Sequence, residues 1–266
     1  MPTTNNKQKK DQFIAVCADS RDEAERLLPA ARRMADCFHK GIIVFTCSPD
    51  GEQWVDTLGH PYAALKSDWP SAIEAMPTAF NVVLAMALCD HKARRDSMAN
   101  PRQLLKNFRL SKVAYLSIPS TVTELRFNHV GLSLDHQRES KEKLIWASYM
   151  ARFCSSQIDV YHLPYTDPDF RNRCNNNFRY LDKIFSSLSL SYEKHILESS
   201  SQLANPDSKT LALGECDMLI SLVPDLRNRD LFDLFATPQP LRLLRSADHT
   251  PILFLNQRDD LYVMCD

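Results

Sequence analysis

The first regular pattern along the chain is a short apolar run followed by a stretch of helical periodicity. Residues 13–17 are apolar and predict a buried strand. Residues 20–38 place apolar side chains at spacings of three and four, which predicts an amphipathic helix with one buried face. Ser20 and Glu23 form a capping box at the start of this helix. Gly41 is expected to end it, because glycine accepts the left-handed conformation after a helix.

The same pattern recurs 116 residues further along the chain. Residues 129–135 form an apolar run that ends in an aspartate, as residues 13–19 do. A strand that ends at a proline then follows the helix in both places, at 42–49 and at 159–164. Four helix positions carry identical residues at this offset: Leu28 and Leu144, Ala31 and Ala147, Met34 and Met150, Ala35 and Ala151. The pattern therefore indicates two diverged copies of one unit.

Each copy also closes in the same way. A continuous apolar run, 81–88 in the first copy and 217–223 in the second, predicts a buried strand. A polar loop follows, and then a helix that begins at Pro101 or at Pro238. The last strands are expected at 113–118 and 251–255.

The two copies differ in the middle. Residues 169–190 predict a full helix before a strand at 192–197, whereas the first copy has only residues 51–61 there, so its helix is short or lost. Strands that alternate with helices predict an α/β fold with two tandem doubly wound units, each a mainly parallel five-stranded sheet with helices on both faces. The expected boundaries are a flexible leader at 1–12, a first domain at 13–120 and a second at 127–266.

This order of elements resembles the universal stress protein family over nearly the whole chain, as two tandem domains. The resemblance implies an adenine nucleotide alpha hydrolase-like unit in each copy. ATP-binding members carry a loop of the form G-x-x-G-x(9)-G-[ST], whose glycines let backbone amides close on the phosphates. The corresponding residues, 89–101 and 224–238, contain no glycine. The glycine-rich ATP loop is therefore missing in both copies.

The resemblance also indicates where a ligand would bind. Asp19 and Asp135 occupy the position where the family's strand-end aspartate lies beside the nucleotide, and His136 adds a polar group in the second copy. The structural alternative is that each aspartate caps its helix or lies at the carboxyl edge of its strand.

Cations in the two glycine-free loops are the other ligand candidates. Arg94 and Arg95 lie in the first loop, and Arg227 and Arg229 in the second. Such side chains can hold phosphate where backbone amides cannot. The alternative is a solvated polar loop with ion pairs, because aspartates lie alongside the arginines.

Composition narrows the functional classes. The chain is 44% hydrophobic and 24% charged, with a formal net charge of −1, as in a soluble globular protein. This balance gives no general attraction to nucleic acid or to a membrane surface, and no apolar stretch is long enough for a membrane span. We expect a cytoplasmic protein whose eight scattered cysteines are reduced.

No motif for catalysis or metal binding occurs in the sequence. The eight histidines show no HExxH or paired H-x-x-H spacing, and no P-loop, GxGxxG or nucleophile elbow is present. We therefore expect no catalytic residue, no metal and no cofactor. A site assembled only in three dimensions, or an enzyme with another chemistry, would leave no local motif in the sequence.

The resemblance implies an intramolecular pseudo-dimer, in which the last strands of the two copies pair antiparallel. We expect a non-catalytic regulatory or binding module in the stress response, with a protein partner or a small ligand. The chain would be a monomer with a pseudo-two-fold axis or a homodimer. The alternative is a stress protein that binds ATP or AMP and hydrolyses nucleotide weakly.

Overall fold

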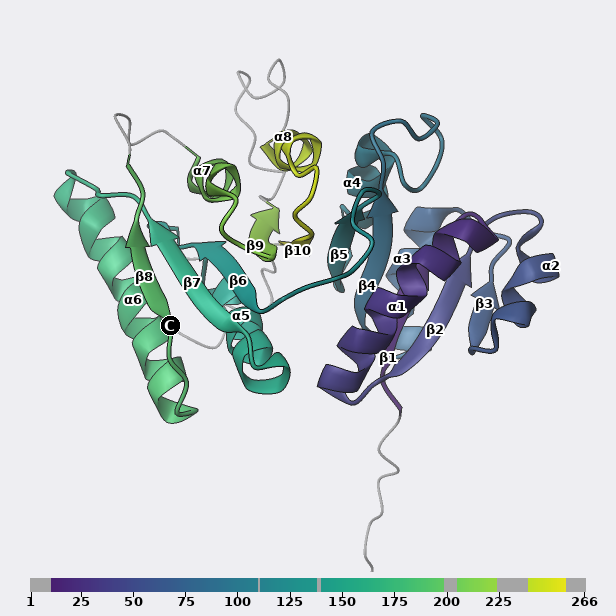
Figure 1. Cartoon of the computed structure of the whole chain (residues 1–266), viewed down its shortest axis with the longest axis horizontal. Coiled ribbons are helices and arrows are strands. Elements are labelled where there is room, and N and C mark those ends of the chain that lie inside the picture. Colours follow the sequence, from purple (N-terminus) through teal and green to yellow (C-terminus); the bar gives the residue numbers. More distant parts are fainter. Residues whose placement is uncertain (1–10, 110, 138–139, 199–204, 224–238, 257–266) are drawn as a thin grey trace, which may run out of the picture.

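A single mixed sheet forms the centre of the molecule. The computed structural model describes residues 11–109, 111–137, 140–198, 205–223 and 239–256. Within these residues, ten strands join in the order β3-β2-β1-β4-β5-β10-β9-β6-β7-β8 (Figure 1). The strands are β1 (Phe13–Cys17), β2 (Gly41–Thr46), β3 (Tyr62–Ala64), β4 (Val82–Cys89), β5 (Ala114–Pro119), β6 (His129–Ser133), β7 (Gln157–His162), β8 (Glu193–Ile196), β9 (Met218–Val223) and β10 (Ile252–Asn256).

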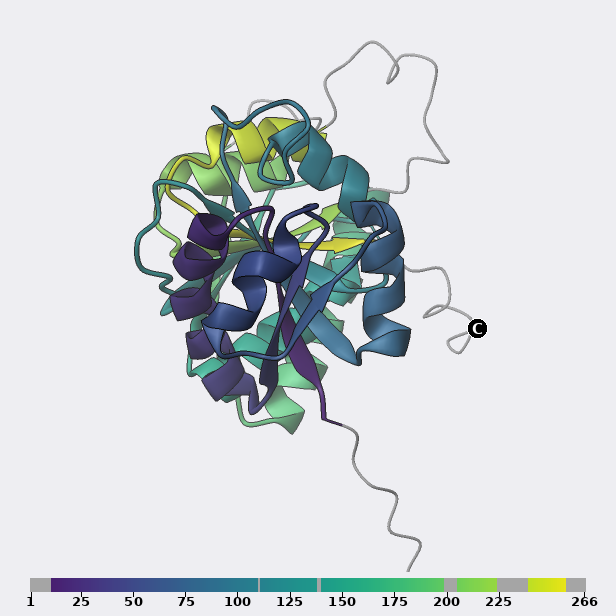
Figure 2. The same cartoon turned by 90° about the vertical axis from the view of Figure 1, so that its right-hand side faces the viewer.

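Helices cover both faces of this sheet. Helices α1, α5 and α6 pack on one face, and α3, α4 and α8 on the other; Figure 2 shows α1 and α3 on opposite sides. The helices are α1 (Arg21–Phe38), α2 (Gly51–Val55), the 3-10 helix η1 (Asp56–Leu58), α3 (Trp69–Ala79), α4 (Pro101–Phe108), α5 (Lys141–Cys154), α6 (Pro168–Ser187), α7 (Pro206–Leu213) and α8 (Gln239–Ser246). None of the helices in the described residues is long and apolar enough to cross a membrane.

The strand order confirms the predicted fold class. From each outer edge inward, the halves run β3-β2-β1-β4-β5 and β8-β7-β6-β9-β10. Neighbouring strands within each half are parallel, as in a doubly wound unit. The halves meet where β5 and β10 pair antiparallel, with Ser117 opposite Ile252. This is the pairing of last strands that the family resemblance implied.

The start of α1 follows the prediction closely, but its end does not. The Ser20 side chain accepts a hydrogen bond from the Glu23 amide at 3.4 Å, and the Glu23 carboxylate accepts one from the Asp19 amide at 2.8 Å. The predicted role of Gly41 is wrong, because His39 takes the left-handed conformation (φ 53°) and Gly41 is the first residue of β2. A Cβ at Gly41 would lie 2.7 Å from the Phe13 ring, so this position needs glycine's small size.

The middle segments differ as expected. Helix α6 has 20 residues, whereas α2, which follows β2 in the first half, has only 5. β3, α3 and α7 were not predicted from the sequence. The expected helix start at Pro238 lies outside the described residues, and α8 is described from Gln239.

Side chains from both halves meet along the seam between β5 and β10. Tyr115 of β5 stacks between Phe108 and Phe254, at ring distances of 4.4 and 5.2 Å. On the other face of the sheet, the Phe38 ring of α1 lies 6.3 Å from the Trp146 ring of α5. Segment 120–128 crosses between the halves (Figure 1). Both hydrophobic clusters contain residues of both halves, so the core layer on each face of the sheet continues from one half into the other.

A buried ionic network lies inside the second half. Lys143 of α5 and Asp207 of α7 are 2% and 5% exposed, and Lys143 Nζ lies 3.8 Å from Asp207 Oδ1. Two serine hydroxyls, of Ser133 on β6 and Ser221 on β9, donate hydrogen bonds to the Asp207 carboxylate. Lys143 in turn donates to the Ser133 hydroxyl at 3.1 Å. The network therefore joins α5, α7 and two central strands.

Candidate functional site

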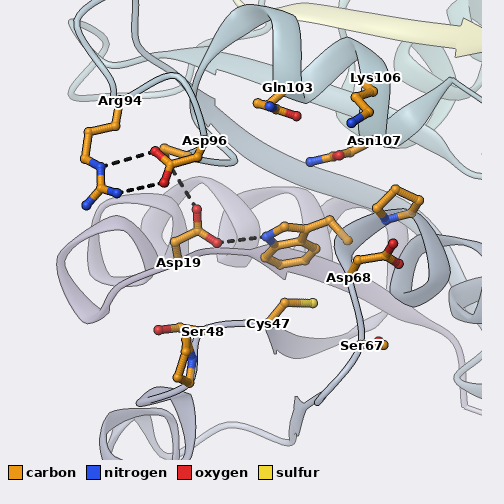
Figure 3. Close-up of a pocket in the computed structure, with 14 residues that line it drawn as sticks. Asp19, Cys47, Ser48, Ser67, Asp68, Arg94, Asp96, Gln103, Lys106 and Asn107 are labelled. Carbon is orange, nitrogen blue, oxygen red and sulfur yellow. Dashed lines mark hydrogen bonds and ion pairs between the residues drawn. The ribbon is translucent and has the colours of Figure 1, made fainter.

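A pocket opens at the carboxyl ends of β1, β2 and β4. Helix α1, which follows β1, and helix α4, which follows β4, pack on opposite faces of the sheet, and ligands of open α/β sheets bind at such switch points. The cavity measures about 630 Å³. Figure 3 shows Gln103, Lys106 and Asn107 of α4 on one wall, opposite Cys47 and Ser48. The full lining is Asp19, Cys47, Ser48, Pro49, Ser67, Asp68, Trp69, Pro70, Arg94, Asp96, Ser97, Gln103, Lys106 and Asn107.

Asp19 lies in this pocket, but its carboxylate is already bound by the protein's own donors. Oδ1 accepts a hydrogen bond from the Trp69 indole N–H at 2.8 Å. Oδ2 accepts one from the Met98 amide at 2.7 Å and one from the Ser97 hydroxyl at 3.4 Å. Ser20, and not Asp19, caps α1. Asp19 therefore lies at the carboxyl edge of its strand, where it ties the start of α3 and the loop after β4 to β1.

The charges around the pocket are unfavourable for a polyphosphate. Three carboxylates, of Asp19, Asp68 and Asp96, face two cations, Arg94 and Lys106. Arg94 forms an exposed ion pair with Asp96 at 2.7 Å. Asp68 accepts a hydrogen bond from the Ser71 amide at 3.0 Å as the N-cap of α3, and its hydrogen bonds with Ser71 lower its pKa. A lining with more carboxylates than cations suits a neutral or cationic ligand better than ATP.

Cys47 is a poor nucleophile in this pocket. Burial, together with the smaller effect of the Asp19 and Asp68 carboxylates, raises the pKa of its thiol to about 12. The thiolate is the reactive form of cysteine. At neutral pH the thiol of Cys47 is therefore protonated and unreactive.

This pKa predicts slow alkylation of Cys47. At pH 8 we expect iodoacetamide to modify it about a thousand times more slowly than a free cysteine of pKa near 8.5, because the thiolate fraction is smaller by about that factor. The rate should rise about tenfold per pH unit from pH 7 to 11. Peptide mapping by mass spectrometry measures the rate, with the same peptide in the urea-unfolded chain as control. A rate that levels off near pH 9 would contradict the raised pKa.

Arg95 lines a different pocket from Arg94. This second cavity measures about 600 Å³ and lies beside the start of α4, where Asn100 caps the helix. It is lined by His91, Ala93, Arg95, Asn100, Pro101, Arg102, Gln103 and Arg245. Among the residues that the structure describes, three arginines and no carboxylate line it, and Arg245 comes from α8 of the other half. Its electrostatics favour an anion.

The second half has a different arrangement at the corresponding strand end. The Asp135 carboxylate accepts a hydrogen bond from the Gln137 amide at 2.9 Å and another from the Ser140 hydroxyl. The His136 ring stacks on Phe170 at 4.2 Å, and its buried Nδ1 has no hydrogen-bond partner among the described residues. Asp135 thus organises the turn before α5, and the His136 ring packs among aromatic side chains.

The structure brings together only part of the predicted set. Asp19 and Arg94 share the first pocket, Arg95 lines the second, and Asp135 with His136 lies in the other half. Arg227 and Arg229 fall outside the described residues. Trp69 was not among the site residues predicted from the sequence. A signal was present, because Asp68-Trp69-Pro70 has an N-cap residue followed by a proline in the first turn, which indicates the start of a helix.

The fold, but not the sequence, matches known proteins. No protein-family model matches the chain, and neither does any curated protein. A universal stress protein from Archaeoglobus fulgidus DSM 4304 superposes with a TM-score of 0.58 at 12% identity, over 93% of this chain and 97% of that one. A functionally unknown protein from Pseudomonas aeruginosa PAO1 gives 0.58 at 13% identity, over 97% of each chain. At these identities the likeness shows a universal stress protein-like fold.

Proposed function

We propose that the chain is a universal stress protein-like binding or regulatory module that acts without catalysis in a stress response. It would consist of two tandem domains, residues 13–120 and 127–266, joined as an intramolecular pseudo-dimer. The mirrored strand order and the antiparallel pairing of β5 with β10 support this arrangement. The likeness in fold to the Archaeoglobus protein supports the family.

The main support for this proposal is the hydrogen bonding of Asp19. Its carboxylate accepts hydrogen bonds from Trp69, Met98 and Ser97, so internal donors occupy most of its acceptor sites. The loop after β4 has no glycine to bring backbone amides close to phosphates. The neighbouring thiol is protonated at neutral pH. A small neutral or cationic ligand, bound in the first pocket without turnover, fits these properties.

The second cavity favours the alternative function. Arg95, Arg102 and Arg245 converge there beside the start of α4, and cationic side chains can take the place of a backbone phosphate cradle. The two pockets share Gln103, so they are adjacent. An ATP- or AMP-binding protein would place its phosphates in this second cavity.

A thermal-shift titration distinguishes the two functions. A ligand at about 100 times its dissociation constant stabilises a protein by about 2.7 kcal/mol. Under the proposed function, ATP with Mg²⁺ or AMP at millimolar concentration gives no rise in the melting temperature, and phosphate release from ATP stays at the buffer rate.

The matched pair Arg94→Ala and Arg95→Ala identifies the pocket if a shift is seen. Both arginines are exposed neighbours, but they line different cavities. A nucleotide-induced shift that Arg95→Ala abolishes and Arg94→Ala retains would establish the alternative and overturn the non-nucleotide function.

A further inference from the structure

A cluster of two histidines and two carboxylates lies on one face of β6, β7 and β8, far from the pockets described above. Asp159 is at its centre on β7. The His195 Nε2 atom lies 2.9 Å from Asp159 Oδ1, and the His129 Nδ1 atom lies 3.4 Å from Asp159 Oδ2. Glu193 is the parallel-strand partner of Asp159 on β8. The three strands lie side by side at the edge of the sheet in Figure 1.

The carboxylate of Asp159 is buried without a permanent cation. Its side chain is 7% exposed, and the only basic groups within ion-pair distance in the described residues are the two imidazoles. It also accepts a long hydrogen bond of 3.4 Å from the side-chain Nε2 of Gln157. The adjacent Lys194 packs on the Phe178 ring, 3.8 Å from its centroid. Because a buried charge is costly unless it is paired, this carboxylate needs a cation.

The first half shows that the cluster is not required by the fold. The register of the strands places Phe13 at the position of His129, Ile43 at that of Asp159 and Ala63 at that of His195. All three side chains of the first half belong to or pack against the apolar cluster under α3 and α4. The second half therefore has polar residues that can ligate a metal where the first half has apolar core residues.

We propose that Asp159, Glu193 and His195 bind a divalent transition-metal ion, Zn²⁺ in the first instance, with His129 at the free oxygen of Asp159. One ligand atom from each of the three residues lies within 4.8 Å of the others. Ligand atoms about 2.1 Å from a tetrahedral zinc ion lie about 3.4 Å apart. Binding therefore requires the 2.9 Å contact between His195 Nε2 and Asp159 Oδ1 to widen slightly, and any ligand separation near the 4.8 Å limit to shorten. Imidazole nitrogen with carboxylate oxygen is a donor set that zinc accepts.

The exposure of the ligands sets the character of the site. Asp159 is buried, His195 is about one-third exposed and Glu193 is exposed, so an ion enters from solvent at the edge of the sheet. The ion would bridge β7 and β8, the strand at the edge of the described sheet. Bound zinc should therefore hold the edge strand in place and raise the melting temperature.

The test is a zinc titration of the full chain after removal of metals, by calorimetry or by competition with a chromophoric chelator. We expect one equivalent of Zn²⁺ to bind. Asp159→Asn and His195→Gln should each weaken binding about 100-fold or more, and His129→Ala about tenfold, since loss of a supporting residue costs about 10- to 100-fold in affinity. Co²⁺ in place of Zn²⁺ should give visible absorption that disappears in Asp159→Asn.

Two matched controls keep the test decisive. His60→Ala and Glu52→Gln remove a partly exposed histidine and an exposed glutamate of the first half and should leave the zinc affinity unchanged. Asp159→Asn preserves shape and removes a buried charge, so we expect it to fold, and circular dichroism checks this. The proposal is overturned if the wild-type chain binds no stoichiometric zinc, or if folded Asp159→Asn and His195→Gln bind it as tightly as the wild type.

Discussion

Replacing Lys143 with methionine should destabilise the protein by about 3–5 kcal/mol, because removing one partner of a buried ion pair leaves the other charge unpaired. Lys143 is 2% exposed, and among the described residues the Asp207 carboxylate would retain the hydroxyls of Ser133 and Ser221 as its side-chain partners. Methionine approximates the length of the lysine stem, so loss of packing contributes little. Equilibrium unfolding in urea measures the change.

A second substitution identifies the cause. Adding Asp207→Asn to Lys143→Met removes the uncompensated charge, so most of the lost stability should return. The asparagine oxygen accepts from one serine hydroxyl, and its NH2 group donates to the other. Lys183→Met, on the exposed surface of α6, should change stability by no more than about 0.5 kcal/mol. If the double variant is no more stable than Lys143→Met alone, the buried charge is not the source of the loss.

Tyr115→Ala should cost about 3–5 kcal/mol, the range for truncating a large aromatic side chain in a core. The Tyr115 ring is 1% exposed and stacks on Phe108 from its own half and on Phe254 from the other. Its removal opens a cavity at the seam between β5 and β10. Urea unfolding followed by far-ultraviolet circular dichroism measures the loss.

Two matched aromatic variants test this explanation. Tyr115→Phe keeps both ring contacts and should cost less than about 1.5 kcal/mol. Tyr62→Ala removes a tyrosine of β3 that is 46% exposed and should have a much smaller effect. A loss for Tyr62→Ala equal to that for Tyr115→Ala would mean that the seam contributes nothing special to stability.

Much of the architecture was predictable because it depends on periodic patterns. The segment that forms α1 has a 3.6-residue period because one face of the helix is buried. β4 and β9 are continuous apolar runs because both faces of these strands are buried. The elements that were missed are short or weakly patterned. β3 has only three residues, and the buried side chains of α7 are the polar Asp207 and Thr210, so neither element presents an apolar period that could be recognised.

The chemistry of the sites was less predictable. The prediction placed Asp19 at a strand end beside a pocket, but not its hydrogen bond to Trp69, which lies 50 residues away. His129, Asp159 and His195 come together only through the register of three parallel strands. Contacts of this kind depend on strand order, which no local spacing encodes.

The seam has a consequence for the nascent chain. Strand β5 ends at Pro119, whereas its partner β10 begins at Ile252, so β5 is synthesised well before the strand that it pairs with. Until β10 has been made, the edge of β5 that pairs with it in the folded protein is unpaired. An unpaired strand edge is a template for association with other chains. Because β5 and β10 are far apart in the sequence, they pair late. The interval after translation of the first half is therefore the period of greatest aggregation risk.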